Sequence, residues 1–251
     1  NDADGDNYSA DSCGGTDCDD NDPGIYPDAT GLCVQGSSCA ELLSNGLTID
    51  GAYGIDVDGI NTGQASELLW CDLNIYGGGW TLVGRNTEQD GNWNPYSVVN
   101  NTTFGDLATT EYKTDAYSVL PFTDVMFTDG VLYAVYENVG DGSQSFLDFS
   151  NAIPNPNCGS SSGYNWPMTA GNFTGSGLCN TNLYMHPIDE DGGYNSSCDP
   201  YLAGWTNNAS GPTWSVGQNN GCPLDDVNVT SFTYNGSVLP WLKTGLELYI
   251  R

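Results

Sequence analysis

Residues 71–83 read CDLNIYGGGWTLV, and this stretch decides the interpretation of the fold. Its last four residues, Trp80, Thr81, Leu82 and Val83, include the aromatic and β-branched types that strands prefer, so they predict a strand. Glycine triplets such as the one before Trp80 occur in many folds. The residues on either side of this strand are therefore what identifies the domain.

A short helix is predicted upstream of this strand. Ser38 stands three residues before Glu41, which is the spacing of a capping box. Leu42 and Leu43 follow, and Gly46 is a stop signal. The predicted helix therefore occupies the few residues between Ser38 and Gly46.

Downstream, strand signals predominate, and long stretches separate them. Apolar runs at 125–128 and 131–135 flank an Asp-Gly pair, which predicts a hairpin, and the Asn-Gly pair at 235–236 predicts a second one. An alternating apolar pattern over 246–250 predicts a closing strand. Residues 140–224 are rich in Gly, Asn, Ser and Pro, so we expect long loops there, held by metal ions and disulfides.

The chain has 251 residues and carries 32 acidic side chains against four basic ones, a formal net charge of −28. Such a charge excludes an electrostatic partnership with DNA, RNA or an anionic membrane, because it repels polyanions. No apolar run approaches the roughly 20 residues that a membrane-spanning helix needs. With 38% hydrophobic residues, the chain still has enough apolar area for a buried core.

Nine cysteines without any C-x-x-C pair indicate an oxidising, extracellular compartment in which disulfides supplement the core. Free cysteines in a cytosolic protein are the alternative. Cys13 and Cys18 enclose a short Gly-Gly loop, and we expect them to pair with each other. Because nine is an odd number, one thiol is left unpaired or is shared with another chain.

The first 28 residues hold nine aspartates, no glutamate and no basic residue. Short carboxylates at alternate positions are typical of loops that wrap oxygen ligands around a hard cation, and calcium is the natural candidate. The EF-hand frame does not fit, because Asn7 and Cys13 stand where it requires glycine and glutamate. A solvated acidic tail without metal is the alternative. Residues 1–30 resemble thrombospondin type 3 repeats and related modules of bacterial secreted proteins. The predicted calcium ligands in this segment are Asp2, Asp4, Asp6, Asp17, Asp19 and Asp22.

Residues 38–251, which follow a linker at 31–37, resemble the fibrinogen-related domains and, among them, the intelectins, or X-type lectins. The resemblance rests on an ordered series of short motifs: Cys39, Cys71-Asp72, the Gly-Gly-Gly-Trp-Thr segment, Asp90-Gly-Asn-Trp93, Thr103-Phe-Gly105, Cys179-Asn-Thr181, Gly192-Gly-Tyr194 and the terminal residues 246–251. It implies an α+β fold with a small twisted sheet, few short helices and long loops held by disulfides and calcium. It also implies a Cys39–Cys71 disulfide.

In intelectins a partly open calcium ion takes two adjacent sugar hydroxyls as its last ligands, which six- to eight-fold oxygen coordination permits. The resemblance assigns Asn180, Asn182 and His186 to that ion, although the family has an acidic residue where this chain has Asn182. The family's later carboxylate has no counterpart at its own position, and Glu190 or Asp191 is expected to replace it. His186 is the only histidine, so protonation in mild acid should weaken sugar binding.

In this family two aromatic rings flank the bound diol as the walls of the site. Trp205 and Trp214 have the corresponding spacing after Cys198. Two core tryptophans are the alternative interpretation. Further calcium ions hold loops in the family, and the residues at or near matching positions are Glu88, Asp90, Glu111 and Asp199. Cys158–Cys179 and Cys198–Cys222 are plausible disulfides, which leaves Cys33 as the odd thiol.

These features predict an extracellular, calcium-dependent lectin for glycans with terminal vicinal diols, without catalysis and with oligomerisation left open. A calcium-stabilised structural or adhesive module without a sugar site is the main alternative, because fold alone does not decide function. Gly159-x-Ser161-x-Gly163 matches a nucleophile elbow, but no strand is predicted before it and no acidic residue lies between it and His186. One histidine rules out a zinc site of several imidazoles, and no spacing singles out a pair of glycosidase carboxylates.

Overall fold

The computed structural model divides the chain into two compact units, Asn1–Leu82 with Arg251 and Val83–Ile250, and each is described by itself. Both consist mainly of strands with few short helices, in keeping with the predicted α+β class. Among the described residues, no helix is long and apolar enough to cross a membrane. The structure describes residues 3, 17–18, 25–27, 33–58, 66–86, 101, 103, 105–108, 112–128, 130, 133–152, 165–167, 169–171, 181–186, 201–206, 212–217, 233–234, 237–238 and 246–251.

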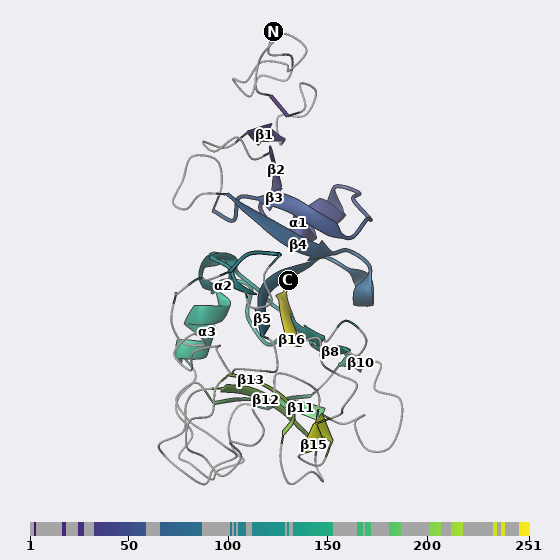
Figure 1. Ribbon diagram of the computed structural model, residues 1–251, viewed down its shortest axis with the longest axis vertical. Helices are drawn as coiled ribbons and strands as arrows, with labels where there is room; N and C mark the ends of the chain where they lie inside the picture. The colour runs from purple at the N-terminus through teal and green to yellow at the C-terminus, as the bar shows by residue number, and fades with distance from the viewer. Residues whose placement is uncertain are drawn as a thin grey trace. The chain divides into compact units, whose positions relative to one another are not determined.

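Short strands and one six-residue helix build the first unit (Figure 1). β1 (Tyr26–Pro27) pairs antiparallel with β2 (Cys33–Gly36), β2 runs parallel to β3 (Gly51–Ile55), and β3 pairs antiparallel with β4 (Glu67–Asp72). A Cβ at Gly54 would overlap the carbonyl oxygen of Cys33, so the close approach of β2 requires glycine at this position. β2 falls within the predicted linker, and the predicted domain boundaries stay predictions.

The predicted helix is confirmed as α1 (Cys39–Ser44). Ser38 caps it, because its Oγ accepts a hydrogen bond from the backbone N of Glu41 at 3.1 Å. The Glu41 carboxylate accepts from the backbone N and the Oγ of Ser37 at 2.7 and 2.6 Å, and these bonds lower the pKa of Glu41. A disulfide from the fully buried Cys39 to Cys71 ties the helix to β4.

The glycine triplet shapes the turn that leads into β5 (Trp80–Asn86). Its three residues have φ angles of 87°, 73° and 80°, in the left-handed region that favours glycine. A Cβ at Gly78 would overlap the backbone of Leu73. A single 3-10 turn, η2 (Ile75–Gly77), precedes it, and Trp80 Nε1 donates to the Ile75 carbonyl at 2.7 Å. The strand predicted at Trp80 is thus confirmed, and the fully buried indole anchors it.

Antiparallel pairs also build the second unit (Figure 1). The residues of β5 that belong to it pair with β6 (Tyr112–Lys113), while β7 (Val125–Thr128) pairs with β8 (Tyr133–Tyr136). β10 (Ala170–Gly171) pairs with β8, and β16 (Leu246–Ile250) pairs with β7. β14 (Thr233–Tyr234) and β15 (Ser237–Val238) form a small sheet. The closing strand and both predicted hairpins are therefore confirmed.

Aromatic side chains fill the core of the second unit beside α2 (Ala116–Val119) and α3 (Phe146–Ala152). The ring centroid of Phe146 lies 5.2 Å from those of Tyr117 and Phe122, and the Phe122 centroid lies 5.4 Å from that of Phe149. The rings meet at tilted or edge-on angles, which their quadrupoles favour. This buried cluster joins the two helices.

A four-stranded antiparallel sheet lies within the stretch for which we predicted long loops, and at its residues that prediction is wrong. Its strands mix polar residues and glycine with aromatics, so the apolar alternation that marks a strand in the sequence is weak. Pairing with distant segments decides their conformation. The order is β13 (Pro212–Gly217), β12 (Tyr201–Thr206), β11 (Thr181–His186) and β9 (Asn165–Pro167).

Candidate functional site

The four-stranded sheet brings together three of the residues predicted to bind a glycan. Asn182 and Trp205 are direct partners in the antiparallel pair of β11 and β12. Trp214 on β13 is the partner of Gly204, the residue before Trp205. Direct partners in an antiparallel pair have Cα atoms about 4.5–5.5 Å apart. The backbone therefore makes one predicted calcium ligand and one predicted wall residue direct partners. Trp214 shares the register position of Gly204, which alternates with Trp205 along β12, so its role as the second wall residue stays a prediction.

The pairing of β12 with β13 is irregular at this same place. The register shifts between Gly204 and Trp205, because Trp205 is the partner of Pro212 and one extra residue, Thr213, stands on β13. An extra residue of this kind increases the local twist of a strand, and such bulges are frequent beside binding sites. The irregularity and the predicted site thus coincide along the sheet.

His186 lies at the other end of β11, where its partner is Tyr201. It stands four positions after Asn182, and a strand rises about 3.3 Å per residue, so the two Cα atoms are about 13 Å apart. Calcium holds its ligand atoms at about 2.3–2.6 Å. The backbone does not bring His186 beside Asn182 and Trp205, and its role stays a prediction.

Most of the other predicted metal ligands lie outside the described residues, and their roles stay predictions. Asp17 is the exception, and its side chain is buried next to Cys18. Within the part of the chain that the structure describes, no group of three His, Cys, Asp or Glu side chains gathers around one point. The predicted ligands outside the described residues are Asn180, Glu190, Asp191, Glu88, Asp90, Glu111, Asp199, Asp2, Asp4, Asp6, Asp19 and Asp22.

Two disulfides are present among the described residues. Cys39–Cys71, with Cα atoms 5.4 Å apart, confirms the predicted pairing. Cys18–Cys33, with Cα atoms 5.7 Å apart, shows that two predictions were wrong: Cys18 does not pair with Cys13, and Cys33 is not the odd thiol. Cys33 begins β2, and the pairing of β2 with β1 folds the chain back toward the segment that holds Cys18. The remaining cysteines, at 13, 158, 179, 198 and 222, lie outside the described residues.

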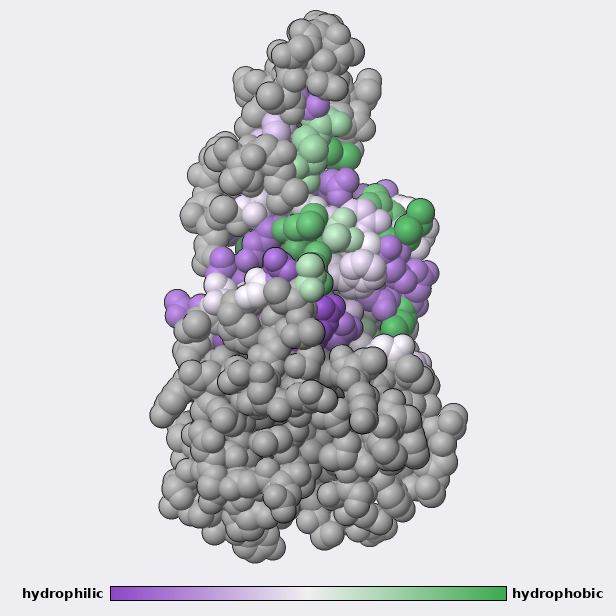
Figure 2. Space-filling view, in the orientation of Figure 1, coloured by the Kyte–Doolittle hydropathy of each residue, from purple (hydrophilic) through white to green (hydrophobic). Residues whose placement is uncertain are grey.

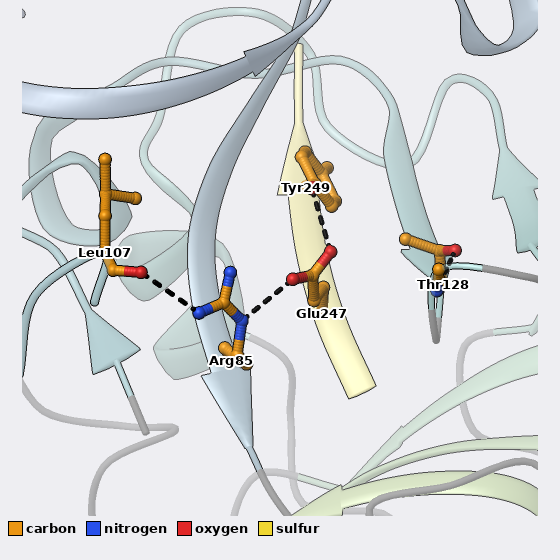
Figure 3. A network of polar contacts seen from close by, with 6 residues as sticks. Arg85, Leu107, Thr128, Glu247 and Tyr249 are labelled. Atoms are coloured by element: carbon orange, nitrogen blue, oxygen red, sulfur yellow. Dashed lines mark hydrogen bonds and ion pairs between the residues drawn. The ribbon is translucent and has the colours of Figure 1, made fainter. Parts of the chain in front are cut away.

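A polar network in the second unit was not predicted from the sequence (Figure 3). Arg85 Nε donates to Glu247 Oε1 at 2.8 Å, and Arg85 Nη1 donates to the Leu107 carbonyl at 3.4 Å. The hydroxyl of Tyr249 donates to the second carboxylate oxygen of Glu247 at 2.9 Å. Both partners of the ion pair are about one-fifth exposed, so the network holds strands in place rather than presenting a charge to a ligand.

Lys113 is a second feature that the sequence did not reveal. It is the partner of Gly84 in the pairing of β5 with β6, and only 1% of its surface is exposed. Its Nζ lies 4.2 Å from the ring centroid of Tyr117, and burial lowers the pKa of its ammonium to about 7. An amine with this pKa has a lone pair near neutral pH, but its burial keeps substrates away, which favours a structural role.

Arg251 belongs to the first unit and packs within it. Its guanidinium carbon lies 4.2 Å from the ring centroid of Trp80, and its Nη1 donates to the carbonyl oxygens of Tyr76 and Gly78 at 3.0 Å each. The cation therefore closes the turn formed by the glycine triplet. It is engaged with backbone and an aromatic ring rather than with a carboxylate.

Comparison with known proteins gives a likeness to solved structures but not to a known family. No known protein-family profile matches the chain, and no curated protein matches it. Among solved structures, the fibrinogen-like globe domain of human ANGPTL6 matches with a TM-score of 0.41 and 15% sequence identity, over 86% of this chain and 94% of that chain. We therefore base the function on the residues of this chain.

Proposed function

We propose that this protein is an extracellular lectin that binds exocyclic vicinal diols of glycans in a calcium-dependent manner. The observation that carries the proposal is the register of β11 with β12, in which Asn182 is the partner of Trp205. An amide oxygen is a suitable calcium ligand, and an indole packs well against the C–H surface of a sugar. Their proximity supports a site that combines a cation with an aromatic wall.

In the proposed site, the chain supplies oxygen ligands to calcium on one side of the glycan and tryptophan side chains on the other. Calcium, when bound, accepts six to eight oxygens, so two adjacent hydroxyls of a glycan can complete its coordination. Asn182, with Asn180 and with Glu190 or Asp191, supplies protein oxygens. Trp205 and Trp214 limit the width of the substituent that enters. No covalent bond changes, so the protein binds its ligand without catalysis.

Two further observations support this proposal. The disulfides Cys18–Cys33 and Cys39–Cys71 are typical of an oxidising compartment, which fits an extracellular protein. The 32 acidic side chains stand against four basic ones, and bound divalent cations would relieve their mutual repulsion.

The position of His186 favours a second candidate function, a calcium-stabilised structural or adhesive module without a sugar site. A separation of about 13 Å between the Cα atoms of His186 and Asn182 argues against one ion shared by short contacts to both side chains. If His186 and Asn182 each bind a different calcium ion, both ions can be purely structural.

Retention on an immobilised glycan with a terminal exocyclic diol tests the proposal. We expect retention in calcium, elution by EDTA and elution by glycerol, which is itself a vicinal diol. Trp205→Ala and Trp214→Ala should each reduce retention and leave the melting temperature within a few degrees. Trp166→Ala is the matched control for Trp205→Ala and should retain binding, because Trp166 on β9 is the partner of Leu183, which alternates with Asn182 along β11.

The two candidate functions give different results in this assay. A protein that is never retained, but whose melting temperature falls in EDTA, is the structural module and not a lectin. Retention that persists in EDTA contradicts calcium dependence. Full retention at about pH 5 would show that His186 is not a ligand of the ion, because its imidazole is then protonated.

A further inference from the structure

The outer face of the β3–β4 pair is a feature that the proposed function does not use. We define this face by Ala52, Leu68 and Trp70. Ala52 is the direct partner of Trp70, and Leu68 lies two residues before Trp70 on β4. Direct partners and residues two apart on a strand project from the same side of a sheet. These three side chains therefore form one continuous surface.

The opposite face of the same pair is covered. Ile55, Leu69 and Cys71 alternate with the outer residues, and each has 0% of its surface exposed. Cys71 forms the disulfide with Cys39, the first residue of α1, so α1 lies on this inner side. The pair thus has a core face and an outer face, and the usual pattern would place polar residues on the outer one.

The outer face is instead apolar and accessible. Leu68 is 49% exposed and Trp70 is 38% exposed, and Ala52 on β3 is exposed as well. Single exposed apolar residues are normal on a protein, but neighbouring ones that include a tryptophan form a contact surface. Figure 2 shows apolar residues in green directly beside hydrophilic ones in purple on the coloured part of the molecule.

Carboxylates border this apolar surface. Asp72 follows Trp70 by two residues on β4, and its Oδ1 accepts from the backbone N of Ile75 at 2.8 Å. Asp50 stands just before β3, and its Oδ1 accepts from the backbone N of Leu73 at 2.6 Å. These bonds fix the two carboxylates at one end of the outer face. Asp50 is exposed, whereas Asp72 is only 8% exposed.

The negative charge of the first unit favours a cationic partner. Residues 1–82 hold 15 acidic side chains and no lysine or arginine. The only basic residue of the unit, Arg251, is engaged with Trp80 and with two backbone carbonyls. A second copy of this chain would bring carboxylates against carboxylates, whereas a cationic partner is complementary.

We propose that the outer face of the β3–β4 pair is a docking surface for a cationic protein segment that also carries apolar side chains. Apolar groups of the segment pack against Leu68 and Trp70. Its lysines or arginines lie over the Trp70 indole or pair with the exposed Asp50, whereas Asp72 is only 8% exposed and is held by backbone N–H groups. This surface shares no residue with the proposed glycan site, so either proposal can fail without the other.

A peptide probe tests this proposal with the full chain at constant calcium and about 0.15 M salt, where exposed charges are screened beyond about 8 Å. The probe is a labelled peptide of alternating lysine and leucine, read by fluorescence anisotropy. A lysine–serine peptide controls for charge alone, and a glutamate–leucine peptide controls for apolar contact alone. We expect the lysine–leucine peptide to bind most tightly, because it satisfies both parts of the surface.

Three variants locate the binding. Trp70→Ala should weaken the binding of the lysine–leucine peptide roughly tenfold, as expected for the loss of a central aromatic contact. Ala52→Arg removes no contact but adds a positive charge beside Trp70, so it should also weaken binding while the melting temperature stays unchanged. Ile49→Ala is the matched control, because Ile49 is 75% exposed but lies outside the outer face, and it should bind as the parent does.

Several results would overturn the proposal. One is equal affinity for the lysine–serine peptide together with no effect of Trp70→Ala, which would leave only unspecific charge attraction. Another is a dimer in sedimentation that Trp70→Ala dissociates, which would make a second copy the occupant. Peptide binding that is indifferent to Ala52→Arg, or no peptide binding at all, would equally contradict it.

Discussion

Removing the positive charge of Lys113 should change how stability depends on pH. Burial lowers the pKa of this ammonium from its ordinary 10.5 to about 7. The unfolded chain therefore binds a proton at this side chain between about pH 7 and pH 10.5, whereas the folded chain does not. Stability must rise with pH across this window, and the full penalty is present below about pH 7.

The size of the effect follows from the two pKa values. A difference between 10.5 and about 7, at about 1.36 kcal/mol per pH unit, corresponds to on the order of 4–5 kcal/mol of unfolding free energy at pH 6. This is an upper value, because local relaxation and water penetration reduce the cost of a buried charge. At pH 10 the amine is neutral in the folded chain but still mostly protonated in the unfolded chain, so about 4 kcal/mol of the penalty should be gone and about 1 kcal/mol remains.

Lys113→Met tests this reasoning, because methionine has a similar length and no charge. Urea unfolding followed by tryptophan fluorescence at pH 6 and pH 10, at constant calcium, gives the unfolding free energy of each protein. We expect the variant to be more stable than the parent at pH 6 and its advantage to shrink at pH 10. Lys113→Arg is the control, because arginine stays charged, so this variant should be less stable than the Met variant at both pH values. An identical difference between the Met variant and the parent at both pH values would refute the lowered pKa.

Three further changes test the packing. Gly54→Ala should lower the melting temperature by several degrees, since a Cβ there overlaps the backbone of β2, and an unchanged melting temperature would contradict that close approach. Serine at both Cys39 and Cys71, which are 32 residues apart, should reduce the unfolding free energy in urea by about 3–4 kcal/mol, and a loss below about 1 kcal/mol would argue against the chain-entropy effect. Glu247→Gln should cost less than about 1 kcal/mol in the same assay, because its ion pair with Arg85 is partly exposed, and a loss above about 2 kcal/mol would show a larger role.

Local signals in the sequence predicted the elements whose decisive contacts are close along the chain. The Ser38 cap acts within one helical turn, and the Asp-Gly pair before Val131 acts within one hairpin. The glycine triplet before Trp80 likewise fixes a turn through contacts with residues only a few positions away. Such contacts form with little loss of chain entropy, so residue type alone carries much of the information.

Non-local contacts account for what the sequence did not reveal. β11, β12 and β13 contain glycine and polar residues, and they become strands through partners up to dozens of residues away. Cys18 finds Cys33 rather than its neighbour Cys13, because the pairing of β1 with β2 folds the chain back. The burial of Lys113 likewise depends on elements that pack around it, and lysine is ordinarily an exposed residue type. The candidate site could be approached from motif order, but its register required coordinates.

The placement of positive charge connects the two proposals. Arg85, Lys113 and Arg251 are the described basic residues, and each is engaged within the fold by a carboxylate, an aromatic ring or backbone carbonyls. They are used for packing, so they do little to neutralise the 32 acidic side chains of the sequence. Neutralisation must then come from outside the chain, and the two proposed partners supply it differently. Calcium binds by coordination, which chelators reverse, whereas a cationic segment binds through exposed charges and apolar contacts, which monovalent salt weakens only in its ionic part. A chelator and a salt titration therefore separate the two kinds of binding in one preparation of the protein.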